Sequence, residues 1–394
     1  MGVGARMGII LIIIFALAFY TYLGYPLMLW MVSRRKPHIV DVTYRPRVTI
    51  LVAAYNEIEV IEAKIHNSLA LHYPEELIEY IFASDGSDDG TTELIRKYES
   101  NRFKSVAIAT RGGKARALRM SILTVTGDIV ILSDANTMIA SDAVQKLVRH
   151  FKDPNIGAVS GDVQIEKSTG GFGESEGIYY RIERFIQKYE SEAGSIIGVD
   201  GALYGIRKQL FSLPDDNVIL DDFVISMNVV NSGYRVLYDP EALATENATP
   251  TITQEMRRKN RVVAGGYQAL FRYGILGNIS QAWIMFCFIS HKLLRWTLPV
   301  LLLLAVTINP IVVIYDGWYG YTVLLFFQII FYVLAIIGWL KERHWKAPLF
   351  SIPFYFTMVN ISGIWGFSRF ITGSQKVTWK KAERIKITNY PSQK

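Results

Sequence analysis

Residues 129–136 read Ile-Val-Ile-Leu-Ser-Asp-Ala-Asn, an apolar run that ends abruptly in polar side chains. A short run of β-branched residues followed by a turn is typical of a buried strand. Comparable runs at residues 48–54, 77–83 and 105–110 alternate with helical patterns. This alternation predicts a mainly parallel sheet with crossover helices. We therefore expect an α/β, Rossmann-like domain over residues 45–270.

Oxygen-bearing side chains follow three of these strands. Asn56 and Glu57 come after the first strand, Asp85 after the second, and Asp134 and Asn136 after the last. Ligands of open α/β sheets bind beyond the carboxyl ends of the strands, so we expect these side chains to line one crevice. At Asp85 the alternative is a turn with a helix cap, because a Gly-, Ser- and Asp-rich stretch follows it.

Asp134 and Asn136 are the candidate metal ligands. They lie two residues apart, so in an extended segment their side chains point the same way. Mg²⁺ or Mn²⁺ needs few protein oxygens when substrate phosphates supply others. The alternative is a strand-ending turn with an Asx hydrogen bond.

Lys114 ends a short basic, glycine-rich loop after the third strand, residues 111–114 (Arg-Gly-Gly-Lys). Glycines let backbone amides approach a phosphate, and the N-terminus of the helix that follows favours an anion. A simple basic turn is the alternative.

Two later clusters are also charged. Asp221 and Asp222 open a helical pattern, and an acid in the first turn of a helix stabilises it. That role accounts for Asp221 but makes a second acid beside it less necessary. Arg258 and Arg261 belong to a basic cluster, which indicates either a solvated or membrane-facing helix or a site that pairs with a diphosphate.

The composition limits the class of protein. The chain has 394 residues, 51% of them hydrophobic, and a formal net charge of +7. Its single cysteine, Cys287, excludes an internal disulfide and a cysteine-based metal site. We attribute the charge to positive flanks of membrane segments and expect no nucleic-acid partner, because no basic stripe with interleaved aromatic residues occurs.

The first apolar segment, residues 7–32, carries no charge and is long enough to cross a bilayer core of about 30 Å. We expect an N-terminal transmembrane helix over residues 1–33 rather than a cleaved signal peptide. Arg34, Arg35 and Lys36 follow it, and positive flanks stay in the cytoplasm. The next domain is therefore expected to be cytoplasmic.

The C-terminal part is also apolar. We expect an interfacial helix over residues 275–296, because His291, Lys292 and Arg295 interrupt it. A transmembrane region is expected over residues 297–372, followed by a basic tail over residues 373–394. Within that region, residues 349–371 could either cross the membrane or lie along its surface.

The motifs, taken in order, carry a resemblance to a known family. They are AYNE at residues 54–57, DGS at 85–87, GK at 113–114, DAN at 134–136, DD at 221–222 and the basic cluster at 258–261. This order resembles the family-2 glycosyltransferases, most closely the membrane-bound group with cellulose, chitin, hyaluronan and poly-N-acetylglucosamine synthases.

The resemblance implies a GT-A fold that binds a nucleotide sugar, usually a UDP-sugar. It implies that the donor contacts Ala54, Asn56, Glu57, Asp85, Lys114, Asp134, Arg258 and Arg261. It also implies that Asp222 is the general base, that Gly201, Ala202 and Asp221 line the acceptor site, and that Mg²⁺ or Mn²⁺ binds at Asp134 and Asn136.

Three motifs depart from the family pattern. Asn136 replaces the second acid of an Asp-x-Asp motif, and the Thr-Glu-Asp motif reads Leu220-Asp221-Asp222. Of the Gln-x-x-Arg-Trp motif only Arg261 is kept, and Val262 replaces the tryptophan that would stack on an acceptor sugar. The loss of this tryptophan argues against processive synthesis more than against transfer.

We expect an inverting, multi-pass integral membrane enzyme, in the cell membrane, that acts on a polysaccharide or glycolipid acceptor among membrane lipids. The alternatives are a single-sugar transferase acting on a lipid-linked acceptor and a non-catalytic scaffold.

Overall fold

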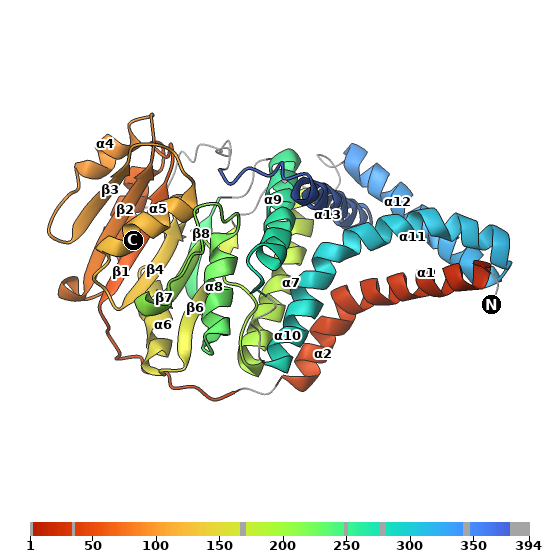
Figure 1. Cartoon of the computed structure of the whole chain (residues 1–394), viewed down its shortest axis with the longest axis horizontal. Helices are drawn as coiled ribbons and strands as arrows, with labels where there is room; N and C mark the ends of the chain where they lie inside the picture. Colours follow the sequence, from red (N-terminus) through yellow and green to blue (C-terminus); the bar gives the residue numbers. More distant parts are fainter. Residues whose placement is uncertain are drawn as a thin grey trace.

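The structure, a computed structural model, describes residues 3–33, 36–165, 171–247, 251–275, 281–341 and 347–378. A sheet domain lies at one end and long helices extend from the other (Figure 1). Arg34 and Arg35 lie outside the described residues, as does most of the predicted basic tail.

The sheet has the strand order β3-β2-β1-β4-β7-β6-β8-β5. Its strands are β1 Val48–Ala54, β2 Ile78–Asp85, β3 Phe103–Ile108, β4 Ile129–Asp134, β5 Met138–Ile139, β6 Ile156–Ile165, β7 Leu203–Arg207 and β8 Arg235–Glu246. The strands from β3 to β4 in this order are parallel, whereas β7 runs antiparallel to both β4 and β6. The α/β, Rossmann-like prediction is confirmed, and beyond β4 the sheet is mixed.

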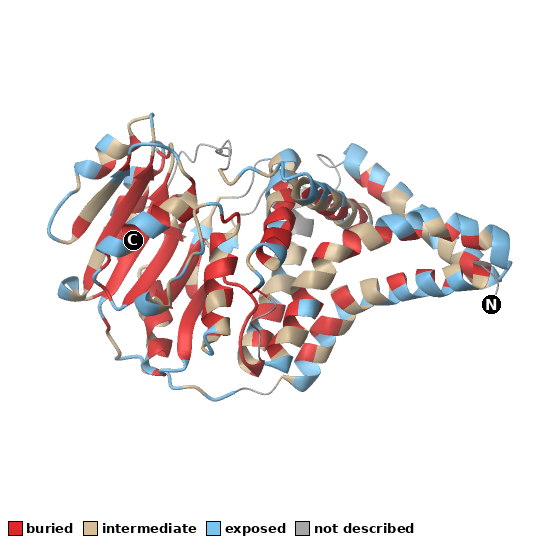
Figure 2. Ribbon diagram, viewed as in Figure 1, coloured by how far each residue is buried: buried red, intermediate tan, exposed pale blue. Residues whose placement is uncertain are grey.

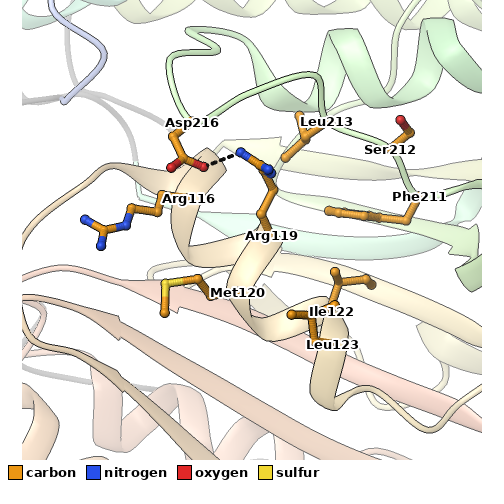
Figure 3. Close-up of a pocket in the computed structure, with 9 residues that line it drawn as sticks. All are labelled: Arg116, Arg119, Met120, Ile122, Leu123, Phe211, Ser212, Leu213 and Asp216. Carbon is orange, nitrogen blue, oxygen red and sulfur yellow. Dashed lines mark hydrogen bonds and ion pairs between the residues drawn. The ribbon is translucent and has the colours of Figure 1, made fainter.

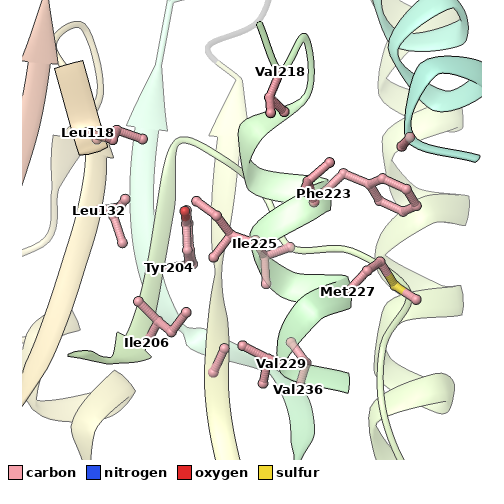
Figure 4. Close-up of a cluster of buried hydrophobic side chains, with 14 of the residues drawn as sticks. Leu118, Leu132, Tyr204, Ile206, Val218, Phe223, Ile225, Met227, Val229 and Val236 are labelled. Atoms are coloured by element: carbon pink, nitrogen blue, oxygen red, sulfur yellow. The ribbon is translucent and has the colours of Figure 1, made fainter. Parts of the chain in front are cut away.

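Helices cover both faces of the sheet, because every residue of β1 is buried and its side chains alternate between two cores. These helices are α3 Ile61–Leu69, α4 Thr91–Arg96, α5 Lys114–Ser121, α6 Ala143–Val148 and α8 Asp221–Asn231. Val52 belongs to the core with α3 and α6, and Leu51 to the core with α5 and α8. Figure 2 shows the strands as the most continuously buried elements, and Figure 4 shows Ile225 and Val229 of α8 packed toward Ile206 of β7.

Within the described residues, three helical stretches are long and apolar enough to cross a membrane: Gly4–Val32, Ala282–Asp316 and Tyr319–Lys341. The first comprises α1 Val3–Phe19, the π-helical turn η1 Tyr20–Gly24 and α2 Tyr25–Val32, and the last is α12 Tyr319–Lys341. Large apolar side chains such as Phe327 and Trp339 are exposed on α12, as on a lipid-facing surface. These helices indicate association with a membrane.

Ala282–Asp316 is one continuous helical stretch made of α10 Ala282–Phe288, the π-helical turn η7 Ile289–Leu293 and α11 Leu294–Asp316. The boundary predicted at residue 296 therefore does not correspond to a break in the helix. Whether the first part of this stretch lies at the membrane surface stays a prediction.

Three further helices join the two parts of the molecule: α7 Gly171–Ala193, α9 Ile252–Phe271 and α13 Pro348–Ile371. α13 packs closely on α9, because a Cβ at Gly366 would lie 2.7 Å from the backbone oxygen of Asn260. It is not among the three candidate spans, so the position of residues 349–371 relative to the membrane stays open.

Candidate active site

Asp85 fixes the loop that precedes α5. Its two carboxylate oxygens accept hydrogen bonds from the backbone amides of Gly112 and Gly113, at 2.9 and 2.7 Å. Gly113 has a positive φ of 98°, a conformation that favours glycine. Contrary to our expectation for this loop, both amides are engaged by Asp85 rather than presented to a phosphate. The consequence is that the next residue, Lys114, is held at the start of α5.

Lys114 is the cationic centre of the site. Its Nζ lies 2.6 Å from Oδ1 of Asp134, 3.6 Å from Oδ2 of Asp221 and 3.5 Å from the backbone oxygen of Gly201. Burial alone would lower the pKa of Lys114, but Asp134, Asp221 and Asp222 outweigh it and hold this pKa well above its ordinary value. One ammonium group thus connects residues that the sequence analysis assigned to the donor and to the acceptor.

Asp222 is a half-buried carboxylic acid whose protonation is balanced near neutral pH. Burial, and then the charge of Asp221, raise its pKa to about 7, while Lys114 opposes them. Its Oδ1 accepts a hydrogen bond of 2.8 Å from the amide of Phe223. A Cβ at Gly201 would lie 2.6 Å from its Oδ2, so only glycine fits beside it without moving that oxygen. A carboxyl group with this pKa is suited to general base catalysis.

Tyr204, on β7, is a further residue of the site and stands three positions after Gly201 of the predicted acceptor-site loop. Its side chain is fully buried, and within the described residues its hydroxyl has no hydrogen-bond partner. Burial, and then the charge of Asp221, raise its pKa well above the ordinary value. The hydroxyl is therefore neutral and able to donate beside Asp221 and Asp222.

Glu246, at the end of β8, is a site residue that was not predicted from the sequence. Its Oε1 accepts a hydrogen bond of 2.7 Å from Nδ2 of Asn136. Burial, and then the charges of Asp134 and Asp200, raise the pKa of Glu246 to about 7. A sequence signal existed, because Glu246 follows an apolar strand in the same way as Asp85 and Asp134 do.

Lys64, on α3, anchors the turn after β4 that carries Asp134 and Asn136. Its buried Nζ donates to Oγ of Ser133 at 2.8 Å and to the backbone oxygen of Thr137 at 2.5 Å. Burial lowers the pKa of Lys64 to about 7, although Asp134 and Glu246 oppose that shift. The turn that carries Asp134 and Asn136 is thus anchored on both sides.

The oxygens at this turn are suited to a hard divalent cation. The carboxylate of Asp134 and the amide oxygen of Asn136 are the ligand types that Mg²⁺ and Mn²⁺ prefer, and Glu246 adds a second carboxylate nearby. No group of three or more His, Cys, Asp or Glu within the described residues is arranged to hold a metal alone. Substrate oxygens would therefore have to complete the coordination.

Three of the predicted donor-binding residues, Ala54, Asn56 and Glu57, lie at or just after the end of β1, the strand next to β4 in the sheet. Asn56 has a positive φ of 54° and exchanges two hydrogen bonds with Asp88, at 2.7 and 3.0 Å. Glu57 donates its amide to Oγ1 of Thr91 at 2.9 Å. Ala54 is buried at the end of β1. The loops after β1 and β2 are thereby joined, and the nucleoside-binding role of these residues stays a prediction.

The two predicted diphosphate-binding arginines are held differently. Arg258 forms a bidentate ion pair with Glu255, at 2.7 and 2.8 Å. Arg261 donates to the backbone oxygens of Ile219 and Val377, at 2.8 and 2.7 Å. The latter bond brings the segment after α13 to the site, where a Cβ at Gly113 would also lie 3.3 Å from Val377.

Contacts of Asp200 hold the predicted acceptor-site loop in place. Its Oδ1 accepts from the amide of Ala202 at 3.2 Å, and its Oδ2 pairs with Arg184 of α7 at 2.8 Å. The loop therefore places Gly201 against Asp222 and is itself held by α7.

A separate surface depression of about 480 Å³ lies between α5 and residues 211–216 (Figure 3). Arg119 and Asp216 form an ion pair of 2.6 Å in it, beside apolar side chains such as Leu123. None of the predicted site residues lines this depression.

Comparison with known proteins agrees with this geometry. Residues 49–212 match the family described as Glycosyl transferase family 2. A poly-beta-1,6-N-acetyl-D-glucosamine synthase of Staphylococcus aureus (strain COL) is 32% identical over 244 residues, which cover 60% of this chain and 58% of that protein. The corresponding synthase of Staphylococcus epidermidis is 31% identical over 231 residues, which cover 57% of this chain and 56% of that protein. The match thus spans little more than half the length of these curated relatives.

A solved structure shares the fold. It is a mannosyltransferase from Pyrobaculum calidifontis in complex with GDP-Man and Mn²⁺, with a TM-score of 0.70 and 23% identity, covering 93% of this chain and 100% of that one. The predicted resemblance is confirmed for residues 49–212, which match a glycosyl transferase family 2 domain, and the chain shares the GT-A fold.

Proposed function

We propose that this chain transfers a sugar from a nucleotide sugar to a membrane-held acceptor, with inversion at the anomeric carbon. The observation that carries the proposal is the environment of Asp222, whose half-buried carboxyl group has a pKa of about 7 and lies against Gly201 and beside Asp221. This is the environment expected of a base that removes the proton of an attacking hydroxyl group.

The donor side of the reaction is assigned to Lys114, Asp134 and Asn136. Lys114 carries the positive charge that a departing diphosphate needs, and its ion pair with Asp134 holds it in position. Asp134 and Asn136 would hold Mg²⁺ or Mn²⁺, which when bound supplies charge stabilisation for the leaving group. Attack by the acceptor oxygen and departure of the diphosphate occur in one displacement, so no covalent enzyme intermediate forms and the configuration inverts.

We propose the kind of donor from the similar proteins. The structural neighbour was solved with GDP-Man and Mn²⁺, and the sequence relatives are named for a polymer of N-acetylglucosamine. We propose a nucleotide diphosphate sugar, with a UDP-sugar as the first candidate, and a polysaccharide or lipid-linked acceptor. Val262 in place of tryptophan favours single addition as the second candidate function.

The orientation is proposed from charge. Lys36 follows the first candidate span, with Arg34 and Arg35 before it in the sequence, so the sheet domain is placed in the cytoplasm. There it would meet cytoplasmic nucleotide sugars, while α7, α9 and α13 hold it at the membrane surface.

The experiment is a donor screen with the purified full-length chain in lipid. UDP- and GDP-sugars are supplied with Mg²⁺ or Mn²⁺, and release of the nucleotide diphosphate is measured. One donor should support release that depends on a divalent cation, with a product that either grows into polymer or extracts into organic solvent as a single adduct. No release with any donor, under conditions in which the chain remains folded, would refute the proposal and favour a scaffold.

A further inference from the structure

The turn after β4 lacks the second carboxylate of the Asp-x-Asp motif in the family that this chain resembles. Asn136 stands two residues after Asp134, where a second acid would give a divalent cation a charged ligand. A neutral amide oxygen is a weaker ligand for a hard cation than a carboxylate. Another part of the chain could compensate, and the structure offers one candidate.

Glu246 is brought to this turn by strand pairing. β5 follows the turn directly and pairs antiparallel with β8, with Met138 opposite Thr245 and Ile139 opposite Ala244. Continuing this register places Glu246 beside the turn, and the hydrogen bond of 2.7 Å from Nδ2 of Asn136 to its Oε1 fixes the contact. The carboxylate therefore reaches position 136 from 110 residues away in the sequence.

The same hydrogen bond orients the amide of Asn136. Because Nδ2 donates to Glu246, the other end of the amide, Oδ1, is the atom left for a cation. Glu246 retains a second carboxylate oxygen, Oε2, which accepts no hydrogen bond from the described residues. Asp134, Asn136 and Glu246 thus offer three oxygen-bearing groups around one turn.

The surroundings hold these groups in place and leave negative charge to be balanced. Lys64 anchors Ser133 and Thr137 on either side of the turn, so the ligands are preorganised. Asp134 and Glu246 bring two carboxylates to this turn. The cations facing them are Lys114, which is also shared with Asp221, together with Lys64 and Arg258.

We propose that Glu246 is a direct ligand of the divalent cation at Asp134 and replaces the carboxylate missing at position 136. The proposal rests on the proposed function, since that function places a cation at the turn. It assigns to β8 a part in donor binding that the motif order alone does not contain.

The test measures binding of Mn²⁺ to the purified full-length chain, without donor or acceptor, by the electron paramagnetic resonance signal of free Mn²⁺. Glu246→Gln keeps the side-chain length and an oxygen that can accept from Asn136 but removes the charge. We expect the dissociation constant for Mn²⁺ to rise by about 10- to 100-fold. Glu241→Gln, a carboxylate on the same strand that pairs with Arg149, is the control and should leave it unchanged.

A double variant separates ligation from positioning. Asn136→Asp in the Glu246→Gln background moves the carboxylate to position 136 and should restore most of the lost affinity. Wild-type affinity in Glu246→Gln would overturn the proposal, because Glu246 would then act only by orienting Asn136. No binding of Mn²⁺ to the wild-type chain at millimolar concentration would overturn it as well. Since no transfer is measured, these outcomes are independent of the donor screen.

Discussion

The two halves of the sheet hold their polar residues by different means. In the part that we propose binds the donor (the donor half, from β3 to β4), the polar side chains lie at the ends of parallel strands and contact neighbouring loops, as Asp85 contacts Gly112 and Gly113. In the part that we propose binds the acceptor (the acceptor half, formed by β7 and β6), they depend on helices from outside the sheet, as Asp200 depends on Arg184 of α7. The donor half is therefore held mainly by contacts between neighbouring loops, and the acceptor half by tertiary contacts with helices outside the sheet.

The acceptor half is also connected to the membrane helices. On α7, Glu190 accepts from Tyr25 of α2 at 2.7 Å and contacts His291 of η7 at 2.9 Å, while Glu183 pairs with Arg295 of α11. The helix that holds the acceptor loop is thus bonded to two candidate spans. A site that receives its acceptor from the membrane gains from such a connection, because acceptor and base are positioned by the same elements.

Removing the residue that joins the halves should have the largest effect. Lys114→Met leaves Asp134, Asp221 and Asp222 without their shared cation. We expect transfer to fall by about a thousandfold, because a preorganised charge at the leaving group is lost, and nucleotide binding to weaken as well. Steady-state rates and nucleotide titrations measure both. Lys104→Met, which breaks a more exposed ion pair with Glu79, is the control. Unchanged nucleotide binding in Lys114→Met would contradict the prediction, because it would show that Lys114 does not contribute to the donor half.

The next effect tests the acceptor half alone. Gly201→Ala adds a Cβ that would lie 2.6 Å from Oδ2 of Asp222, so that oxygen must move. A displaced base should slow transfer by about a hundredfold, with nucleotide affinity retained. Gly177→Ala on α7, where a Cβ meets nothing within 4 Å, should be silent. Normal transfer in Gly201→Ala would mean that the loop is not set against the base.

The pH dependence of transfer is a third test. A base acts in its ionised form, so if Asp222 is the proposed base, the rate should rise with pH through its pKa of about 7. Asp221→Asn removes the charge that raises this pKa, and the midpoint should move to lower pH by roughly one unit. Rates at saturating donor between pH 5 and 9 measure the shift. Asp216→Asn, at an exposed ion pair, should leave the midpoint in place. A shift to higher pH in Asp221→Asn would contradict the assigned cause.

The smallest effect is expected at α7. Arg184→Gln weakens the hold on Asp200 and Asp162, both at 2.8 Å. The acceptor KM should rise by several-fold, because Arg184→Gln loses charge-assisted hydrogen bonds that position the acceptor loop without touching the acceptor. The donor KM should stay constant. Arg181→Gln, an exposed neighbour on the same helix, is the control. A change in donor KM, with acceptor KM unchanged, would contradict the assignment of Arg184 to the acceptor half.

The sequence predicts the donor half better than the acceptor half for a physical reason. Strand ends are local signals, so Asp85, Asp134 and the loop before Lys114 can be located from hydrophobic runs and glycines. Tyr204 reaches the site only because β7 pairs with β4. Glu246 stands at a strand end, but it reaches the turn after β4 only because β8 pairs with β5. Such pairings join distant segments, so the sequence near these residues does not show which site they enter. Asp222 could be predicted because two adjacent acids exceed what a helix N-terminus requires.

The most direct test of the account is Asp222→Asn in the full-length chain, with nucleotide binding and sugar transfer measured on the same preparation. The account predicts that the nucleotide dissociation constant stays within about twofold of wild type, since Asp222 lies in the acceptor half, while transfer falls by about 10²- to 10⁴-fold. Transfer at the wild-type rate, or loss of nucleotide binding together with transfer, would contradict it.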